Sequence, residues 1–125
     1  SKNNEESGML KGLGGLGGLG DMTKMLKAAQ EMQGKMAALT EELHKITVTG
    51  ESGAGLVKAT CTAKGELKSL SIDPSIFRAD DKEVVEDLIL AAVKDAQKRA
   101  ADRMQEEMAR LTQSMGLPAD MKLPF

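Results

Sequence analysis

The sequence predicts an α+β fold, in which a small antiparallel sheet joins two long helices in the order α-β-β-β-α. Three observations predict it. Apolar and polar residues alternate between Ile46 and Ser75, which is the pattern of half-buried strands. On both sides of that stretch, apolar residues recur every three or four positions, as they do along one face of a helix. Glycines divide the alternating stretch at two places, where we expect the chain to reverse.

The alternating stretch is expected to form three strands. The first begins at Ile46 and ends in a reversal, for which three glycines supply positive φ values: Gly50, Gly53 and Gly55. The second, over residues 57–64, has one apolar and one polar face. A two-residue turn at Lys64-Gly65 leads into the third strand, which ends at Pro74 because proline has no N–H for the ladder.

Each flanking pattern predicts one long helix. The first is expected over residues 22–45, with Asp21 as its N-cap and a seam of coiled-coil-like spacing: Met25, Ala29, Met32, Met36, Leu39, Leu43 and Ile46. The second is expected to begin after Asp80 and Asp81 and to end before Gly116, which suits the position after the C-cap.

Both predicted helices are longer than the predicted sheet. Strands of five to eight residues span about 17 to 26 Å, whereas a helix over residues 22–45 spans about 36 Å. We therefore expect two long helices that project from the sheet as arms. A base this small, in a chain whose only aromatic residues are Phe77 and Phe125, has little core of its own, so we expect a homodimer.

The first 20 residues differ in composition from the rest of the chain. Residues 11–20 repeat glycine and leucine, and a G-x-G-x-x-G match begins at Gly12. The dinucleotide-binding form of that motif needs a preceding strand, and none is predicted, so nucleotide binding is not favoured. We expect a flexible Gly/Leu-rich lead-in over residues 1–20 and a single domain over residues 21–125.

The composition argues against several functional classes. The net charge of -2 gives no general support for binding a polyanion. The only cysteine is Cys61 and the only histidine is His44, for which no partner is predicted, so we expect no disulfide, metal or cofactor. The sequence contains no P-loop, nucleophile elbow or His-Glu-x-x-His motif, so neither an enzyme nor a small-molecule substrate is expected. Without a long apolar run or a visible secretory signal, we expect a cytoplasmic protein with no membrane partner.

Basic residues on the two predicted helices are the candidates for contact with phosphate. One stripe on the first helix comprises Lys24, Lys27 and Lys35, and one beside the apolar seam of the second comprises Arg99, Arg103 and Arg110. Lys94 and Lys98 belong to the same basic segment as Arg99 and Arg103. The same residues also fit an ordinary solvated helix face, because acidic residues are interleaved with them. With so few aromatic residues there is no stacking platform, which disfavours sequence-specific reading of single strands.

Several segments of the sequence resemble the YbaB/EbfC family of nucleoid-associated proteins. The similar segments are Met25–Gln33, Val48–Val57, Ile72–Pro74, Asp80–Glu83 and Leu123–Phe125. The resemblance covers roughly residues 20 to 125. It implies an α-β-β-β-α protomer and a dimeric, tweezers-like assembly whose helical arms bind double-stranded DNA without a metal or cofactor. It also places Lys98 and Arg99 where the family carries basic residues on its last helix.

We therefore expect a non-enzymatic, nucleoid-associated protein of the bacterial cytoplasm. It is expected to bind double-stranded DNA mainly through backbone contacts with low sequence specificity, and thereby to alter DNA conformation and influence gene expression. The main alternative is a protein-interaction adaptor whose Met-rich helical arms grip a partner helix. A small-molecule enzyme is a weaker third interpretation.

Overall fold

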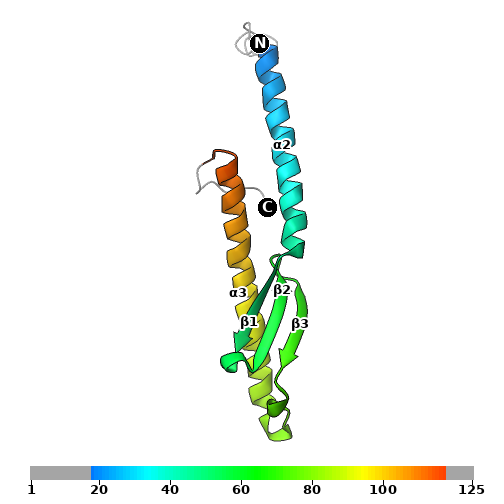
Figure 1. Ribbon diagram of the computed structural model, residues 1–125, viewed down its shortest axis with the longest axis vertical. Coiled ribbons are helices and arrows are strands. Elements are labelled where there is room, and N and C mark those ends of the chain that lie inside the picture. The colour runs from blue at the N-terminus through cyan, green and yellow to red at the C-terminus, as the bar shows by residue number, and fades with distance from the viewer. Residues whose placement is uncertain (1–17, 118–125) are drawn as a thin grey trace, which may run out of the picture. The chain divides into compact units, whose positions relative to one another are not determined.

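The computed structural model of the protein describes residues 18–117 (Figure 1). Its helices and strands follow the order α2 (Gly18–Lys45), β1 (Thr47–Ser52), β2 (Val57–Thr62), β3 (Leu67–Ile72) and α3 (Lys82–Ser114). Short 3-10 turns lie between them: η1 (Gly53–Gly55), η2 (Pro74–Ile76) and η3 (Ala79–Asp81). The predicted α+β fold is therefore confirmed. Within residues 18–117, no helix combines the length and the apolar character needed to cross a membrane.

Helix α2 crosses the division between Ala38 and Leu39, where the structure separates into two compact units. In the first unit the helix begins at Gly18 rather than at residue 22, so Asp21 lies in its first turn and does not cap it. The hydroxyl of Thr23 donates to the carbonyl oxygen of Leu19, 2.8 Å away. Most of the predicted lead-in, residues 1–17, lies outside the described residues.

The three strands form one antiparallel sheet in the order β1-β2-β3. Gly50 of β1 and Leu70 of β3 both lie opposite Ala59 of β2. Residues directly opposite each other share a face, so alternate positions form one continuous apolar face. On β2 this face is buried, as its alternation predicts, while Lys58 on the other face is exposed.

The turn between β2 and β3 differs from the two-residue turn that the sequence predicts. The carbonyl oxygen of Thr62 accepts the N–H of Gly65 at 2.8 Å, and the N–H of Thr62 donates to the carbonyl oxygen of Glu66 at 2.9 Å. The loop between Thr62 and Glu66 therefore has three residues. Gly65 has a φ of 88°, as expected for the left-handed residue that follows a type I turn in such loops. Thr62 is buried although it alternates with the apolar residues of β2, and its hydroxyl accepts the N–H of Glu66 at 3.2 Å.

The glycines around β1 have two different roles. Gly53 and Gly55 have φ values of 58° and 90°, which confirms the predicted reversal, and Ala54 between them also has a positive φ of 54°. Gly50 was predicted to belong to the same turn, and this is wrong, because it lies inside β1. A Cβ atom at Gly50 would lie 2.1 Å from the backbone nitrogen of Ala96 in α3. Gly50 is therefore needed for the close approach of the helix to the strand.

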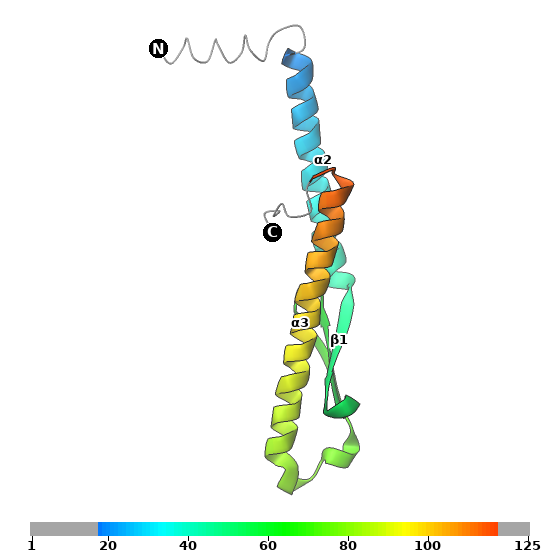
Figure 2. The ribbon, with the colours of Figure 1, turned by 90° about the vertical axis from the view of Figure 1, so that its left-hand side faces the viewer.

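Helix α3 packs along the sheet, mainly over β1 and β2 (Figure 2). The residues that it buries against the sheet are small and recur every four positions: Ala92, Ala96 and Ala100. The thiol of Cys61 donates to the carbonyl oxygen of Ala96 at 3.3 Å, and burial raises the pKa of this thiol. Strand β3 is less covered, since Leu67 and Leu70 keep 49% and 43% of their surface exposed.

A second core lies where the last turns of α2 meet the C-terminal half of α3. Leu39, Leu43 and Ala63 are buried, with partly buried residues packed against them: Ile46, Met104, Met108 and Leu111. The predicted seam of the first helix is therefore buried at its C-terminal end. His44 has a partner that was not predicted, because its Nδ1 lies 2.6 Å from Oε1 of Glu66 at the exposed surface.

Helix α3 ends as its sequence predicts. Gly116 has a φ of 73° and its N–H donates to the carbonyl oxygen of Gln113 at 3.0 Å. The N–H of Leu117 donates to the carbonyl oxygen of Thr112 at 3.1 Å. These two bonds form a Schellman motif, which satisfies carbonyl groups that the helix itself cannot pair.

Candidate nucleic-acid interface

Helix α3 carries five of the predicted phosphate-contacting residues, and most of them are paired with acids of the same helix. Nζ of Lys98 lies 3.1 Å from Oδ2 of Asp102, and Nε of Arg99 lies 3.1 Å from Oδ2 of Asp95. Lys94 is exposed and has no ion pair with another described residue. The interleaved acids that the sequence showed therefore neutralise part of the basic stripe.

Asp95 connects one of these arginines to the sheet. Its Oδ2 accepts both the N–H of Glu51 in β1, at 3.0 Å, and Nε–H of Arg99, at 3.1 Å. The Glu51 N–H, and after it the Arg99 guanidinium, hold the pKa of the Asp95 carboxyl below its usual value. Because the carboxylate is bonded to strand and arginine at once, the Arg99 side chain is oriented relative to β1.

Glu107 holds the two other arginines of the stripe. Its Oε1 accepts Nε–H of Arg103 at 3.0 Å and Nη1–H of Arg110 at 2.7 Å. The Glu107 side chain is only 11% exposed, whereas those of Arg103 and Arg110 are 38% and 66% exposed. The carboxylate therefore lies inward of the two guanidinium groups that it pairs.

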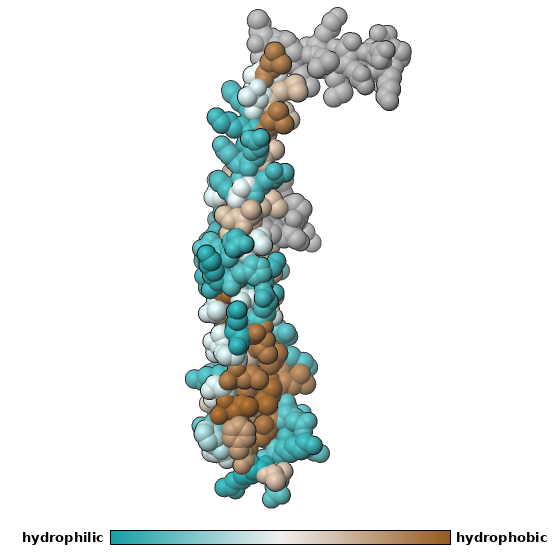
Figure 3. Space-filling view, turned by 90° about the vertical axis from the view of Figure 1, so that its right-hand side faces the viewer, coloured by the Kyte–Doolittle hydropathy of each residue, from teal (hydrophilic) through white to brown (hydrophobic). Residues whose placement is uncertain are grey.

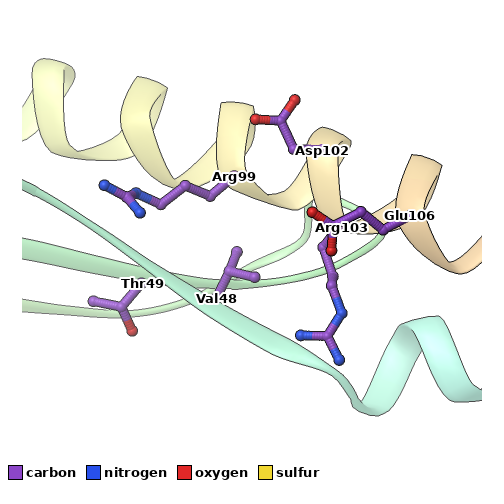
Figure 4. A pocket seen from close by; sticks show the side chains of 6 residues that line it. All are labelled: Val48, Thr49, Arg99, Asp102, Arg103 and Glu106. Carbon is purple, nitrogen blue, oxygen red and sulfur yellow. The ribbon is translucent and has the colours of Figure 1, made fainter.

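A polar pocket of about 400 Å³ lies between β1 and α3, and the predicted arginines form part of its wall (Figure 4). Its lining comprises Val48 and Thr49 from β1 and four charged residues from α3: Arg99, Asp102, Arg103 and Glu106. Figure 4 shows Arg99 and Arg103 extending in different directions along the strand, with Val48 between them. The structure thus brings together two of the predicted cations beside a threonine hydroxyl.

The remaining predicted cations belong to the first unit. Lys24, Lys27 and Lys35 are exposed on α2, and no ion pair joins them to another described residue. They lie on one side of the helix because they are spaced by three and eight positions. Each therefore presents its ammonium group to solvent, unlike the arginines of α3 that acidic partners hold.

The chemistry available here is the binding of anions by guanidinium and ammonium groups. Arg99 and Arg103 use Nε for their acidic partners, which leaves the other N–H donors of each fork for a ligand. Within residues 18–117, no group of three or more histidine, cysteine or acidic side chains has the arrangement of a metal site. The arrangement suits phosphate oxygens, which guanidinium groups bind with matched geometry.

Comparison with known proteins shows the family of this chain. The profile of the YbaB/EbfC DNA-binding family matches residues 18–115. The chain belongs to this family. A nucleoid-associated protein of Methylocella silvestris (strain DSM 15510 / CIP 108128 / LMG 27833 / NCIMB 13906 / BL2) is 44% identical over 99 residues, which make up 79% of this chain and 92% of that protein.

A solved structure supports the same YbaB/EbfC fold. The crystal structure of an uncharacterized protein of Helicobacter pylori matches with a TM-score of 0.58 at 25% identity, over 67% of this chain and 88% of that one. The family resemblance that the sequence segments indicated is therefore confirmed by comparisons made over most of the chain.

Two acidic residues of this candidate site were not singled out from the sequence. Asp95 and Glu107 determine how Arg99, Arg103 and Arg110 are held. A signal for both was present, because each acid lies three or four positions from an arginine on the same helix. The bond from Asp95 to Glu51 of β1 had no such signal, since it joins residues far apart in the chain.

Proposed function

We propose that this member of the YbaB/EbfC family is a nucleoid-associated protein of the bacterial cytoplasm that binds double-stranded DNA. The observation that carries the proposal is the ordered pair Arg99 and Arg103 at the β1–α3 pocket, in a chain that belongs to a DNA-binding family. The name of the Methylocella relative supports the nucleoid role. The proposed activity is binding alone, without catalysis, and its consequences are changes in DNA conformation and gene expression.

The proposed contacts are made to backbone phosphates and carry little sequence information. Arginine and lysine side chains on a helix surface neutralise phosphates whatever the base sequence. Because the Debye length is about 8 Å at physiological salt, a locally basic surface attracts DNA even though the chain has a net charge of -2. The proposed DNA-contacting residues are those of the two helices: Lys24, Lys27, Lys35, Lys94, Lys98, Arg99, Arg103 and Arg110.

A homodimer is the second part of the proposal, and an uncovered apolar face supports it. Leu70 of β3 lies opposite the buried Ala59, so it belongs to the sheet face over which α3 packs, yet it is 43% exposed. Leu90 of α3 and Phe77 are 54% and 65% exposed. Hydrophobic residues gather over the sheet on the side shown in Figure 3. A second copy of the chain, with the same apolar surface, is the occupant that covers this face by twofold symmetry.

Sedimentation equilibrium at micromolar concentration tests the dimer, and twice the chain mass is expected. Leu70→Asp should shift the mass toward that of one chain, because it places a charge in the proposed interface. Ser71→Asp is the matched control, since Ser71 lies next to Leu70 on β3 but on the opposite face. A monomeric wild-type protein contradicts the tweezers-like assembly, in which two protomers enclose the DNA.

A gel-shift titration of duplex DNA at several salt concentrations tests the binding. Removing Arg99 and Arg103 together, each to alanine, should weaken binding to all sequences alike. If each arginine contacts one phosphate in both protomers, the slope of log K against log salt falls by up to about 3.6, at about 0.9 per contact.

The matched control removes two cations from the strands instead of from α3. Lys58 of β2 and Lys68 of β3 are exposed, and neither of them lines the β1–α3 pocket. Changing both lysines to alanine should leave the salt slope nearly unchanged. Equal slopes for the wild type and the arginine variant mean that the stripe is only a solvated helix face and that DNA binds elsewhere.

One observation favours the adaptor as a second candidate function. The first turns of α2 expose a group of large apolar residues: Leu19, Met22, Met25 and Leu26. Exposed Met and Leu on a helix can grip an apolar partner helix. If this is the function, changing Met25 and Leu26 to glutamine abolishes capture of amphipathic helical peptides, and wild-type protein does not shift duplex DNA.

A further inference from the structure

Glu107 is an unusual residue on the basic side of α3. Its side chain is only 11% exposed, far less than those of the two arginines to which it is bonded, one on each side along the helix. Its recorded hydrogen bonds go to Arg103, four positions before it, and to Arg110, three positions after it. Within residues 18–117, no strand or second helix shares these bonds, so they serve the arginines rather than the packing of α3 on the sheet.

A single oxygen accepts both bonds, and this fixes the two guanidinium groups beside each other. Oε1 of Glu107 is 3.0 Å from Nε of Arg103 and 2.7 Å from Nη1 of Arg110. Each guanidinium has five N–H donors, and these bonds occupy one donor of each. Four donors remain on each guanidinium for a ligand, and Arg103 also lines the β1–α3 pocket.

We propose that Glu107 is a positioning residue, which assembles Arg103 and Arg110 into one phosphate-binding unit. This rests on the proposed function, since the ligand is a backbone phosphate of duplex DNA. The carboxylate lowers the positive charge of the unit, and on charge alone it weakens DNA binding. The carboxylate favours binding in another way, by restricting the rotamers of the two arginines. A free arginine must lose its rotamer freedom when it binds a phosphate, whereas a held arginine has already lost it.

Glu106 provides a matched comparison for this proposal. It lies next to Glu107, lines the β1–α3 pocket and is exposed, and no hydrogen bond joins its side chain to another described residue. Glu106→Gln and Glu107→Gln each remove one negative charge from the same turn of the helix. A role of charge alone predicts the same tightening of DNA binding in both variants.

The positioning role predicts that the two variants differ in a salt-dependent duplex-binding assay. Glu106→Gln should bind more tightly than wild type with an unchanged salt slope. Glu107→Gln should bind duplex DNA more weakly than Glu106→Gln, by roughly two- to tenfold for each arginine that Glu107 no longer holds. This factor corresponds to the free energy of ordering one long side chain on binding. The salt slope of Glu107→Gln should fall by about 0.9 for each phosphate contact that is lost. Equal tightening in the two variants overturns the proposal.

A measurement without DNA separates this proposal from the proposed function. In nitrogen-15 NMR spectra of the full chain, the Nε–H of Arg103 should exchange slowly with water in wild type and in Glu106→Gln. It should exchange quickly in Glu107→Gln, while the backbone amide spectrum stays the same. Equal exchange in all three proteins refutes positioning by Glu107, whatever the DNA result. Slow, Glu107-dependent exchange in a protein that binds no duplex refutes the proposed function instead, and with it the phosphate role of Glu107.

Discussion

Changing Gly50 to alanine should destabilise the protein strongly, although the substitution adds only one methyl group. A Cβ atom at this position would lie 2.1 Å from the nitrogen of Ala96 and 2.7 Å from the carbonyl oxygen of Ala92. Both are backbone atoms of α3, so no side-chain rotation can relieve the overlap. To restore a normal contact of about 3.5 Å, the helix must move by more than about 1 Å.

The expected cost follows from the movement of α3. Overpacked cores lose about 1 to 3 kcal/mol, and we expect the upper end here because the contact is with rigid backbone. A loss of about 3 kcal/mol lowers the thermal midpoint by roughly 12 to 24 °C for a domain of this size. The shift would also separate Asp95 of α3 from the N–H of Glu51, which now lies 3.0 Å from its carboxylate. Urea and thermal unfolding, followed by circular dichroism, measure the effect.

Gly34→Ala is the matched control for this substitution. Gly34 lies inside α2, and nothing lies within 4 Å of the Cβ that alanine would add. Alanine should therefore favour the helix by roughly 0.5 to 1 kcal/mol. The two Gly→Ala changes should have opposite signs. If the free energy of unfolding of Gly50→Ala is within about 1 kcal/mol of the wild-type value, the close approach of α3 to β1 is not required and the reasoning is refuted.

Three further predictions concern other contacts of the same unit. Asp95→Asn should destabilise the protein at pH 7, and the difference in unfolding free energy should shrink as the pH falls through the lowered pKa of Asp95. The stabilisation from a depressed carboxyl pKa is present above the unfolded pKa and is lost in acid. Unfolding curves at pH 7, 5 and 3 measure the difference, and a pH-independent difference contradicts the prediction. Cys61 is fully buried, so a thiol reagent should modify it only after unfolding, and rapid labelling of native protein would place it at the surface. Gly116→Ala should cost about 1 kcal/mol because φ is 73° there, and Gly116→Asn should cost less because asparagine tolerates this conformation better. Equal thermal midpoints for wild type and both variants would show that the Schellman motif does not contribute to stability.

The sequence by itself determined the elements that depend on local periodicity and local caps. The two-residue period of β2 placed its buried face correctly, because successive side chains of a strand point to opposite sides. Gly116 marked the end of α3, since a left-handed residue is needed there. The family resemblance depended on similar segments and was confirmed over residues 18–115.

Only the tertiary structure decided which residues meet across the chain. The sequence showed Gly50 among turn glycines, but its neighbour Ala96 lies 46 positions away and no local pattern records that contact. The basic stripe was visible, whereas the orientation of Arg99 depends on an Asp95 carboxylate that also bonds Glu51 of β1. The physical reason is that helix and strand periods are set by neighbouring peptide units, while close approaches and shared hydrogen bonds depend on how α3 lies against the sheet.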